Sequence, residues 1–396
     1  MTLLSTELDA TAALRLKMQI LHHGIVPTRP FLDHYGAPYL EKRRAYGNAD
    51  DLAFVGDSLP QEAYLGPARI ITSLNIRPAS PWRLDWSEEE GFFVGDVHGT
   101  VVTPVDFPRR PAFYDYPMSS GGTVKNLITL YGGGSLGIFV YGRCALVDMG
   151  KACQYCSIEP NRSKTDIDFA NVVSEAKLRE ALALALTDTA APIKQIMING
   201  GNFPDPDKSF RYYARLVRAA REVLDESGRE DIELHLIVYP PSDLELFAEL
   251  KGIDVGVAIN TEVYDAEIFR KICPGKTVVG GQRHLHDALC RAAEILGPGH
   301  VYSILVGGLE PQESMDTGME FLSGYGVTPI INVFHADPGT PLYSHPEPSI
   351  ERIREMGTSL ERLFREHSFM TPFYMSCGRN SIDTEAYLGL FSRLPA

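Results

Sequence analysis

The chain has 396 residues and a formal net charge of −14 at pH 7. At roughly 150 residues per domain this length predicts two or three domains around a sizeable core. The 35 glycines and 27 prolines, in a composition that is 44% hydrophobic, predict many turns rather than disorder. The acidic charge argues against a protein that holds nucleic acid or an anionic membrane by bulk electrostatics, so we expect a small-molecule partner.

The chain's N-terminus and its cysteines predict the compartment. No window approaches the roughly 18 apolar residues of a spanning helix, and Glu7 and Asp9 stand where a secretory signal needs a basic flank and an apolar run. Three of the six cysteines lie within thirteen residues. This spacing favours a metal site in a reducing compartment over a disulfide framework, and we therefore expect a cytoplasmic enzyme.

Residues 1–125 are rich in proline and aromatic residues and contain only short strand-like pieces, at 69–76 and 92–103. A pattern of this kind does not identify a fold by periodicity. We interpret the segment as an N-terminal extension, or cap, of unknown fold that packs on the rest of the chain.

Residues 126–345 alternate short β-rich runs with helical patterns, which is typical of βα units on a parallel sheet. Right-handed crossovers would curl the sheet into an α/β fold, a partial (βα)6 TIM-type barrel with its chemistry at the carboxyl ends of the strands. The tail, residues 346–396, predicts one helix at 349–367 and completes the barrel. The six expected strands are 136–142, 193–199, 232–239, 254–260, 301–307 and 327–334.

Cys144, Cys153 and Cys156 form the pattern C-x8-C-x2-C directly after the first expected strand of the barrel. A tetrahedral zinc site needs four ligands, and no histidine lies between His98 and His235. Three local thiolates therefore point to a 4Fe-4S cluster with one open iron. The alternatives are a zinc site with a distant fourth ligand, or three unligated cysteines.

The other three cysteines, Cys273, Cys290 and Cys377, are scattered along the chain. Such spacing favours buried or inert thiols over an auxiliary cluster.

With these residues in place, the segment 134–345 resembles the radical S-adenosylmethionine (SAM) superfamily, in particular its biotin synthase-like group. Members hold the cluster on the loop after the first strand, most often as C-x3-C-x2-C with an aromatic residue before the last cysteine. Tyr155 matches that aromatic residue, whereas the first gap here has eight residues instead of three.

The resemblance extends to four further strand ends, the last of them at 332–341, and implies a SAM-binding site at the other three. Gly200, Gly201 and Asn202 resemble the family's Gly-Gly-Glu turn, with asparagine in place of the usual glutamate. The remaining implied SAM contacts are Tyr155, Asn260, Glu262, Gly307 and Glu310.

The implied activity is reductive cleavage of SAM to a 5′-deoxyadenosyl radical, which abstracts hydrogen from a small molecule in biosynthesis. The three cysteines would hold the catalytic cluster. A one-electron reductant such as flavodoxin or ferredoxin would supply the cluster with electrons. Four residues near carboxyl strand ends are substrate candidates: His235, Tyr239, Asn332 and His335.

Two other functions stay open at this point. The first keeps the cluster and SAM but transfers a 3-amino-3-carboxypropyl, methyl or sulfur group. The second, of another class, is a non-catalytic metal-binding interaction module.

Overall fold

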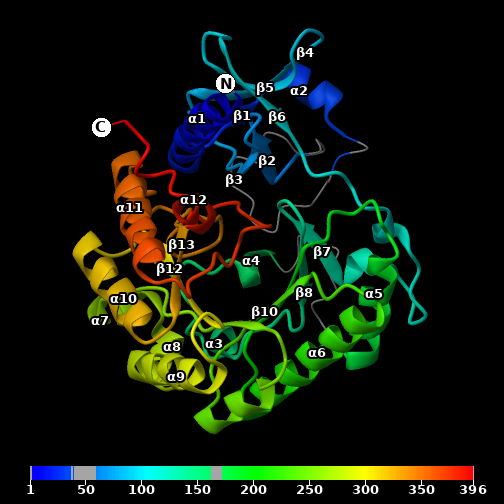
Figure 1. The fold of residues 1–396 in the computed structure, drawn as a ribbon, viewed down its shortest axis with the longest axis vertical. Coiled ribbons are helices and arrows are strands. Elements are labelled where there is room, and N and C mark those ends of the chain that lie inside the picture. Colours follow the sequence, from blue (N-terminus) through cyan, green and yellow to red (C-terminus); the bar gives the residue numbers. More distant parts are fainter. Residues whose placement is uncertain (1, 37–38, 40–58, 162–171, 396) are drawn as a thin grey trace.

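The computed structural model describes residues 2–36, 39, 59–161 and 172–395. Two sheets organise them, a six-stranded sheet in the order β1-β4-β5-β6-β2-β3 and a seven-stranded sheet in the order β13-β12-β11-β10-β9-β8-β7. Figure 1 shows the first sheet at the top, beside the N-terminal helix, and the second curling within a ring of helices below it.

The larger sheet confirms the predicted partial (βα)6 barrel. Its strands from β8 to β13 pair in parallel in sequence order, so every connection crosses over. The strand β7, which the sequence pattern did not predict, pairs antiparallel with β8 as an added edge. The bounds are β7 Ile128–Tyr131, β8 Ser135–Phe139, β9 Gln195–Asn199, β10 Glu233–Ile237, β11 Gly256–Ala258, β12 Val301–Gly307 and β13 Thr328–Val333.

Helices cover the outer face of this sheet (Figure 1). The helix α6 shows why they form: Phe210, Val217 and Leu224 recur at helical spacing and are buried, and the side chain of Asp205 caps the first turn by accepting from two backbone N–H groups. The covering elements are α5 Glu175–Leu186, α6 Pro206–Glu226, η4 Leu244–Leu250, α9 Gly281–Leu296, α10 Gln312–Gly324 and α11 Ile350–Glu366.

The N-terminal region has a fold that its sequence did not reveal. The helix α1 packs on the smaller sheet, and a cluster of aromatic rings, including Phe31, Tyr35 and Phe107, fills its core. The elements are α1 Thr2–His23, β1 Val26–Pro27, α2 Arg29–His34, β2 Glu62–Leu65, β3 Ile70–Ser73, β4 Trp82–Ser87, β5 Gly91–Asp96, β6 Val101–Asp106, η2 Ala112–Asp115 and η3 Val124–Asn126.

The two ends of the chain meet. Lys17, on α1, is fully buried, and its ammonium lies 2.8 Å from a carboxylate oxygen of Glu385 and donates to the backbone carbonyl of Ser381 at 2.6 Å. Glu385 belongs to the short helix α12, Asp383–Tyr387. The N-terminal helix therefore holds the C-terminal tail against the barrel. The domain boundaries expected at 125/126 and 345/346 stay a prediction.

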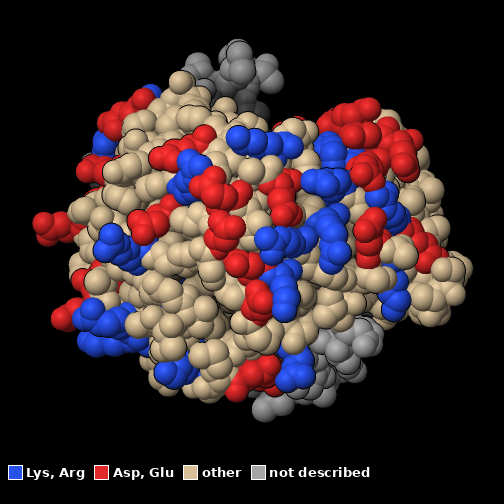
Figure 2. Space-filling model, turned by 90° about the horizontal axis from the view of Figure 1, so that it is seen from below, with Lys and Arg blue, Asp and Glu red and all other residues tan. Residues whose placement is uncertain are grey.

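Acidic and basic side chains are interspersed on one face of the molecule. On the face shown in Figure 2, arginines and lysines lie beside aspartates and glutamates rather than in one basic patch. Several arginines pair across neighbouring elements, as Arg179 does with Glu222 and Arg291 with Glu245. None of the helices in the described ranges is long and apolar enough to cross a membrane.

Candidate functional site

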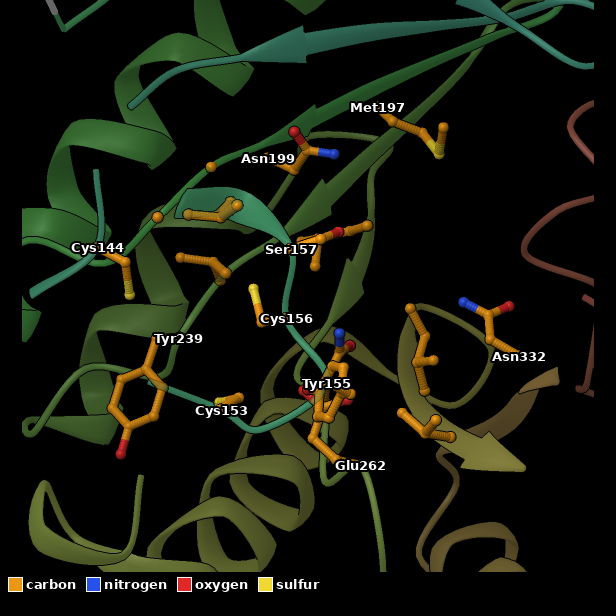
Figure 3. A pocket seen from close by; sticks show the side chains of 18 of the residues that line it. Cys144, Cys153, Tyr155, Cys156, Ser157, Met197, Asn199, Tyr239, Glu262 and Asn332 are labelled. Carbon is orange, nitrogen blue, oxygen red and sulfur yellow. The ribbon is translucent and has the colours of Figure 1, made fainter. Parts of the chain in front are cut away.

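A cavity of about 440 Å³ opens at the carboxyl edge of the larger sheet. Two segments close it, which we name the cysteine loop, residues 140–157, and the C-terminal loop, residues 374–380. Figure 3 shows the three cysteines on one side of this cavity and Asn332 on the other. The strand ends that line it contribute Phe139, Asn199, Ile237, Val238, Tyr239, Ile259, Asn260, Ile304, Val306, Asn332 and Val333.

The long gap between the first two cysteines contains a short helix, α3, Ala145–Asp148. Cys144 occupies its N-cap position. Lys151 donates its N–H to the carbonyl of Leu146 at 2.9 Å, and this bond folds the segment after α3 back onto the helix. A second short helix, α4, Ile158–Asn161, follows Cys156. The eight-residue gap is thus a folded insertion, and all three cysteines still line the same cavity.

The three thiols share one wall without converging on one point. The described residues contain no group of three or more histidine, cysteine, aspartate or glutamate side chains that could hold a metal ion. An iron–sulfur cluster is larger than a single ion and takes thiolate ligands on separate irons. Three thiols spaced along one wall of a cavity fit that requirement.

Burial and neighbouring thiols set the protonation of these cysteines. Burial, together with Cys153, raises the pKa of Cys156 to about 12. In contrast, a hydrogen bond from Cys273 lowers the pKa of Cys153, and the same contact raises that of Cys273. Metal ligation by cysteine requires the thiolate, so loading this site releases protons.

The turn after β9 fits closely against the cysteine loop. Gly201 donates its N–H to the carbonyl of Tyr141 at 2.7 Å, and a Cβ at Gly201 would lie 1.7 Å from the carbonyl oxygen of Arg143. The carbonyl of Asn202 accepts from Ala145 at 2.8 Å. Only glycine allows this approach, and Gly200, Gly201 and Asn202 all line the cavity.

Glu262 enters the cavity from a strained backbone. Its φ is +67°, which is uncommon for a residue with a side chain, and its N–H and carbonyl bond to the neighbouring strand at Ile304 and Val306. The ammonium of Lys276 donates to Glu262 at 2.6 Å and to the carbonyl of Asn260 at 2.8 Å. Burial is the largest influence on the pKa of Lys276 and lowers it, but Glu262, Cys273 and Cys153 together outweigh burial and the net shift is upward. Lys276, which no local pattern indicated, therefore fixes both predicted SAM contacts.

Tyr155 lies beside Glu262 on the cavity wall (Figure 3). Burial and the Glu262 carboxylate keep the pKa of the Tyr155 phenol well above its ordinary value. The phenol of Tyr155 is therefore neutral where it lines the cavity.

Gly307 and Glu310 do not line the cavity. A Cβ at Gly307 would meet Ile331 and Met356, which shows that this glycine serves packing. The Glu310 carboxylate accepts from the N–H groups of Tyr264 and Asp265, so it stabilises the start of the next helix. That helix is α7, Ala266–Ile272, and α8, Pro274–Val278, follows it. The structure gives both predicted SAM contacts a structural role, and contact with SAM stays a prediction.

Three of the four substrate candidates line the cavity, and His235 does not. His235 packs instead against the ring of Phe373, with centroids 4.3 Å apart. Tyr239 donates its hydroxyl to the carbonyl of Val279. Asn332 has a buried Oδ1 without a hydrogen-bond partner in the described ranges. Such an atom is costly to bury, and this cost needs an explanation beyond the packing of the fold.

His335 belongs to a connected group at the cavity edge. Its Nδ1 lies 2.9 Å from Asp337 Oδ1, and the hydroxyl of Ser157 donates to Asp337 Oδ2 at 2.8 Å. Asp337 and Ser157, which the sequence did not single out, thus tie His335 to the residue after Cys156.

The C-terminal loop supplies the wall opposite the cysteines. Arg379 lines the cavity with φ +66°, and its Nε lies 3.7 Å from Glu62 Oε2 of the N-terminal region. Gly132, in the turn between β7 and β8, lies so close that a Cβ there would be 1.8 Å from the carbonyl oxygen of Cys377. The triple glycine at 132–134 is therefore a turn that seats the C-terminal loop.

Known proteins resemble parts of this chain. No known family profile matches it. Bacteriochlorophyllide c C-7(1)-hydroxylase of Chlorobaculum limnaeum is 26% identical over 233 residues, which cover 56% of this chain. The match spans 57% of that relative, little more than half its length.

Two solved structures match larger parts of the chain at low sequence identity. Methylornithine synthase is 15% identical with a TM-score of 0.40, covering 64% of this chain and 71% of that one. A radical SAM methyltransferase from Sphaerobacter thermophilus is 14% identical with a TM-score of 0.44, covering 78% and 82%.

Proposed function

We propose that this chain is a radical SAM enzyme that acts on a small molecule in biosynthesis. One observation carries the proposal: Cys144, Cys153 and Cys156 line a single cavity together with the Gly200–Gly201–Asn202 turn and Glu262. Cysteines for a cluster and polar groups for SAM thus meet at the carboxyl edge of a parallel sheet, where such folds place their chemistry.

The three cysteines would hold a 4Fe-4S cluster, and the donor set fits it because all the ligands are thiols on one wall. When bound, the cluster supplies the electron that cleaves SAM reductively to the 5′-deoxyadenosyl radical.

This chain's own residues would bind and orient SAM. Asn199 and Asn260 each have a buried Oδ1 without a partner in the described part of the chain, and both lie on the cavity wall. An amide oxygen accepts hydrogen bonds from ammonium or hydroxyl groups. Glu262, fixed by Lys276, offers its carboxylate to ribose hydroxyls, as the family resemblance implies.

Substrate would occupy the side of the cavity near Asn332 and His335. The volume of about 440 Å³ is within the range of small-molecule sites. Asp337 lies 2.9 Å from His335 Nδ1 and orients the imidazole at the edge of the cavity. A flavodoxin or ferredoxin as reductant, and a cytoplasmic location, belong to the same proposal.

The test is anaerobic reconstitution with iron and sulfide, followed by SAM turnover with dithionite. We expect about four irons per chain and 5′-deoxyadenosine as the nucleoside product. Formation of 5′-methylthioadenosine or S-adenosylhomocysteine would instead identify a group transfer. Stoichiometric zinc without SAM cleavage would overturn the proposal.

Serine variants assign the ligands. C144S, C153S and C156S should each lose the brown cluster and SAM cleavage. C290S is the matched control, because Cys290 lies on α9 and does not line the cavity. Equal iron content in C290S and all three variants would exclude these cysteines as ligands.

A further inference from the structure

Cys273, which the sequence pattern left among the inert thiols, lies beside Cys153. Gln154 donates its N–H to the carbonyl of Ile272 at 2.8 Å. This bond joins the residue after Cys153 to the residue before Cys273. In antiparallel strands, a backbone bond of this kind lies next to a non-hydrogen-bonded residue pair. The side chains of such a pair approach each other most closely. The two thiols influence each other's protonation, which lowers the pKa of Cys153 and raises that of Cys273.

The contact is built into the packing of the cysteine loop on α8. A Cβ at Gly275 would lie 2.5 Å from the carbonyl oxygen of Lys151 and 2.9 Å from Cβ of Leu146. Any larger residue would push the two segments apart. Because Gly275 follows Cys273 by two residues, this close approach keeps Cys273 at the cysteine loop.

The two sulfurs differ in access. Cys153 lines the cavity, whereas Cys273 is fully buried behind it with an exposed fraction of 0%. A small oxidant that enters the cavity therefore meets Cys153 first, and Cys273 is within reach of the Cys153 sulfur.

We propose that Cys153 and Cys273 form a redox-active dithiol that closes to a disulfide when the chain lacks its cluster and meets a peroxide. The proposal rests on the proposed function only in holding that iron otherwise occupies Cys153. The disulfide would withdraw one cluster ligand until a thiol reductant restores it.

The chemistry balances in two steps. The Cys153 sulfur attacks one oxygen of hydrogen peroxide, the O–O bond breaks, and a sulfenic acid and one water form. The Cys273 sulfur then displaces the hydroxyl group, which leaves as a second water when the S–S bond forms. The two sulfurs together lose two electrons, which peroxide takes up. Without the second thiol, Cys153 would proceed to the irreversible sulfinic acid.

Peptide mapping tests the proposal on the full chain. Cluster-free protein, prepared anaerobically, is treated with hydrogen peroxide, alkylated and digested with trypsin. We expect the peptide 152–162 linked to the peptide 272–276. Because the first of these also contains Cys156, the serine variants decide: C153S and C273S should lose the link, and C156S and C290S should retain it.

In C273S we further expect Cys153 to accumulate as sulfinic acid. Circular dichroism and the alanine variant C273A check that the loss of the link is not a loss of the fold. Failure of the folded wild-type chain to form this link, or links of Cys153 to other cysteines in its place, would overturn the proposal.

A second arm separates this proposal from the proposed function. The protein is reconstituted with iron and sulfide and then treated with diamide, a thiol oxidant, since peroxide destroys iron–sulfur clusters. The link should now be absent. If it forms as readily as in the cluster-free chain, the dithiol is retained and the assignment of Cys153 as an iron ligand is wrong.

Discussion

The two walls of the cavity have different origins. The cysteine loop is one contiguous segment, and its three thiols are positioned by a local insertion, α3, and by the neighbouring turn at Gly201. The opposite wall joins the C-terminal loop to Tyr131 and Asn332, which come from distant parts of the chain. The three proposed cluster ligands thus come from one local segment, whereas the side proposed for substrate is assembled by tertiary contacts.

Long-range contacts from the N-terminal region hold that second wall. Glu62, on β2, accepts from the N–H of Gly132 at 2.9 Å and lies 3.7 Å from Arg379. Lys17 fixes the start of α12 through Ser381 and Glu385. The N-terminal region, expected from the sequence to be a cap, thus supports the C-terminal loop.

The largest expected effect comes from removing the buried cation. Lys17→Met leaves the Glu385 carboxylate buried without its partner, and breaking such a pair costs about 3–5 kcal/mol. We expect a large fall in the thermal midpoint, while the folded fraction still takes up iron because the cysteine loop lies elsewhere. Differential scanning calorimetry and iron content per folded chain measure the two quantities.

The stability lost in Lys17→Met should depend on pH in one direction. Burial raises the pKa of the Glu385 carboxyl, and Lys17 opposes that rise. A carboxyl whose folded pKa is raised contributes stability that is full below its unfolded pKa and is lost as the pH rises through the folded pKa. The deficit of Lys17→Met should therefore shrink on acidification. Lys177→Met, at an exposed position on α5, is the control and should stay within about 0.5 kcal/mol of wild type.

Two glycines allow the walls to be disturbed separately. A Cβ would lie 1.7 Å from a backbone oxygen at Gly201, beside the cysteine loop, and 1.8 Å from one at Gly132, beside the C-terminal loop. Each alanine should cost about 1–3 kcal/mol by overpacking. G201A should also reduce iron uptake, and G132A should leave iron uptake unchanged.

A control is needed for G132A because Gly132 has φ +51°. G252A shares a positive φ, +78°, but its Cβ would meet nothing within 4 Å. G252A should lose only the stability that a side chain at positive φ costs, about 1 kcal/mol. Equal iron loss in G132A and G201A would show that the two walls are not independent.

The sequence predicted the barrel because each of its strands pairs with its neighbours in order. The strand β12 is buried at every residue and matches the predicted 301–307, whereas β11 is shorter than predicted, at Gly256–Ala258. The N-terminal sheet could not be predicted because its pairings skip along the chain: β1 joins β4 in parallel, and β2 joins β6. Short strands with such partners leave no periodic signal.

Distance in sequence also separates the site residues that could be predicted from those that could not. Cys144, Cys153 and Cys156 are recognisable by spacing alone. Lys276 and Arg379 carry no local pattern, because each gains its role from a partner elsewhere, Glu262 for Lys276 and Glu62 for Arg379. A charged residue whose partner is distant in sequence can be placed only once the fold is known.

The smallest expected effect concerns two asparagines near the C-terminal loop. Asn332 has a buried Oδ1 without a partner in the described ranges, whereas Asn380 donates its Nδ2 to the carbonyl of Val333 at 3.1 Å. Removing an unsatisfied polar group is neutral or stabilising, and removing a bonded one costs about 1 kcal/mol. N332L should therefore match or exceed the wild-type thermal midpoint, and N380L should fall below it. A loss of stability in N332L equal to that in N380L would mean that Asn332 serves the fold, and substrate binding would then have to rest on other residues of this wall.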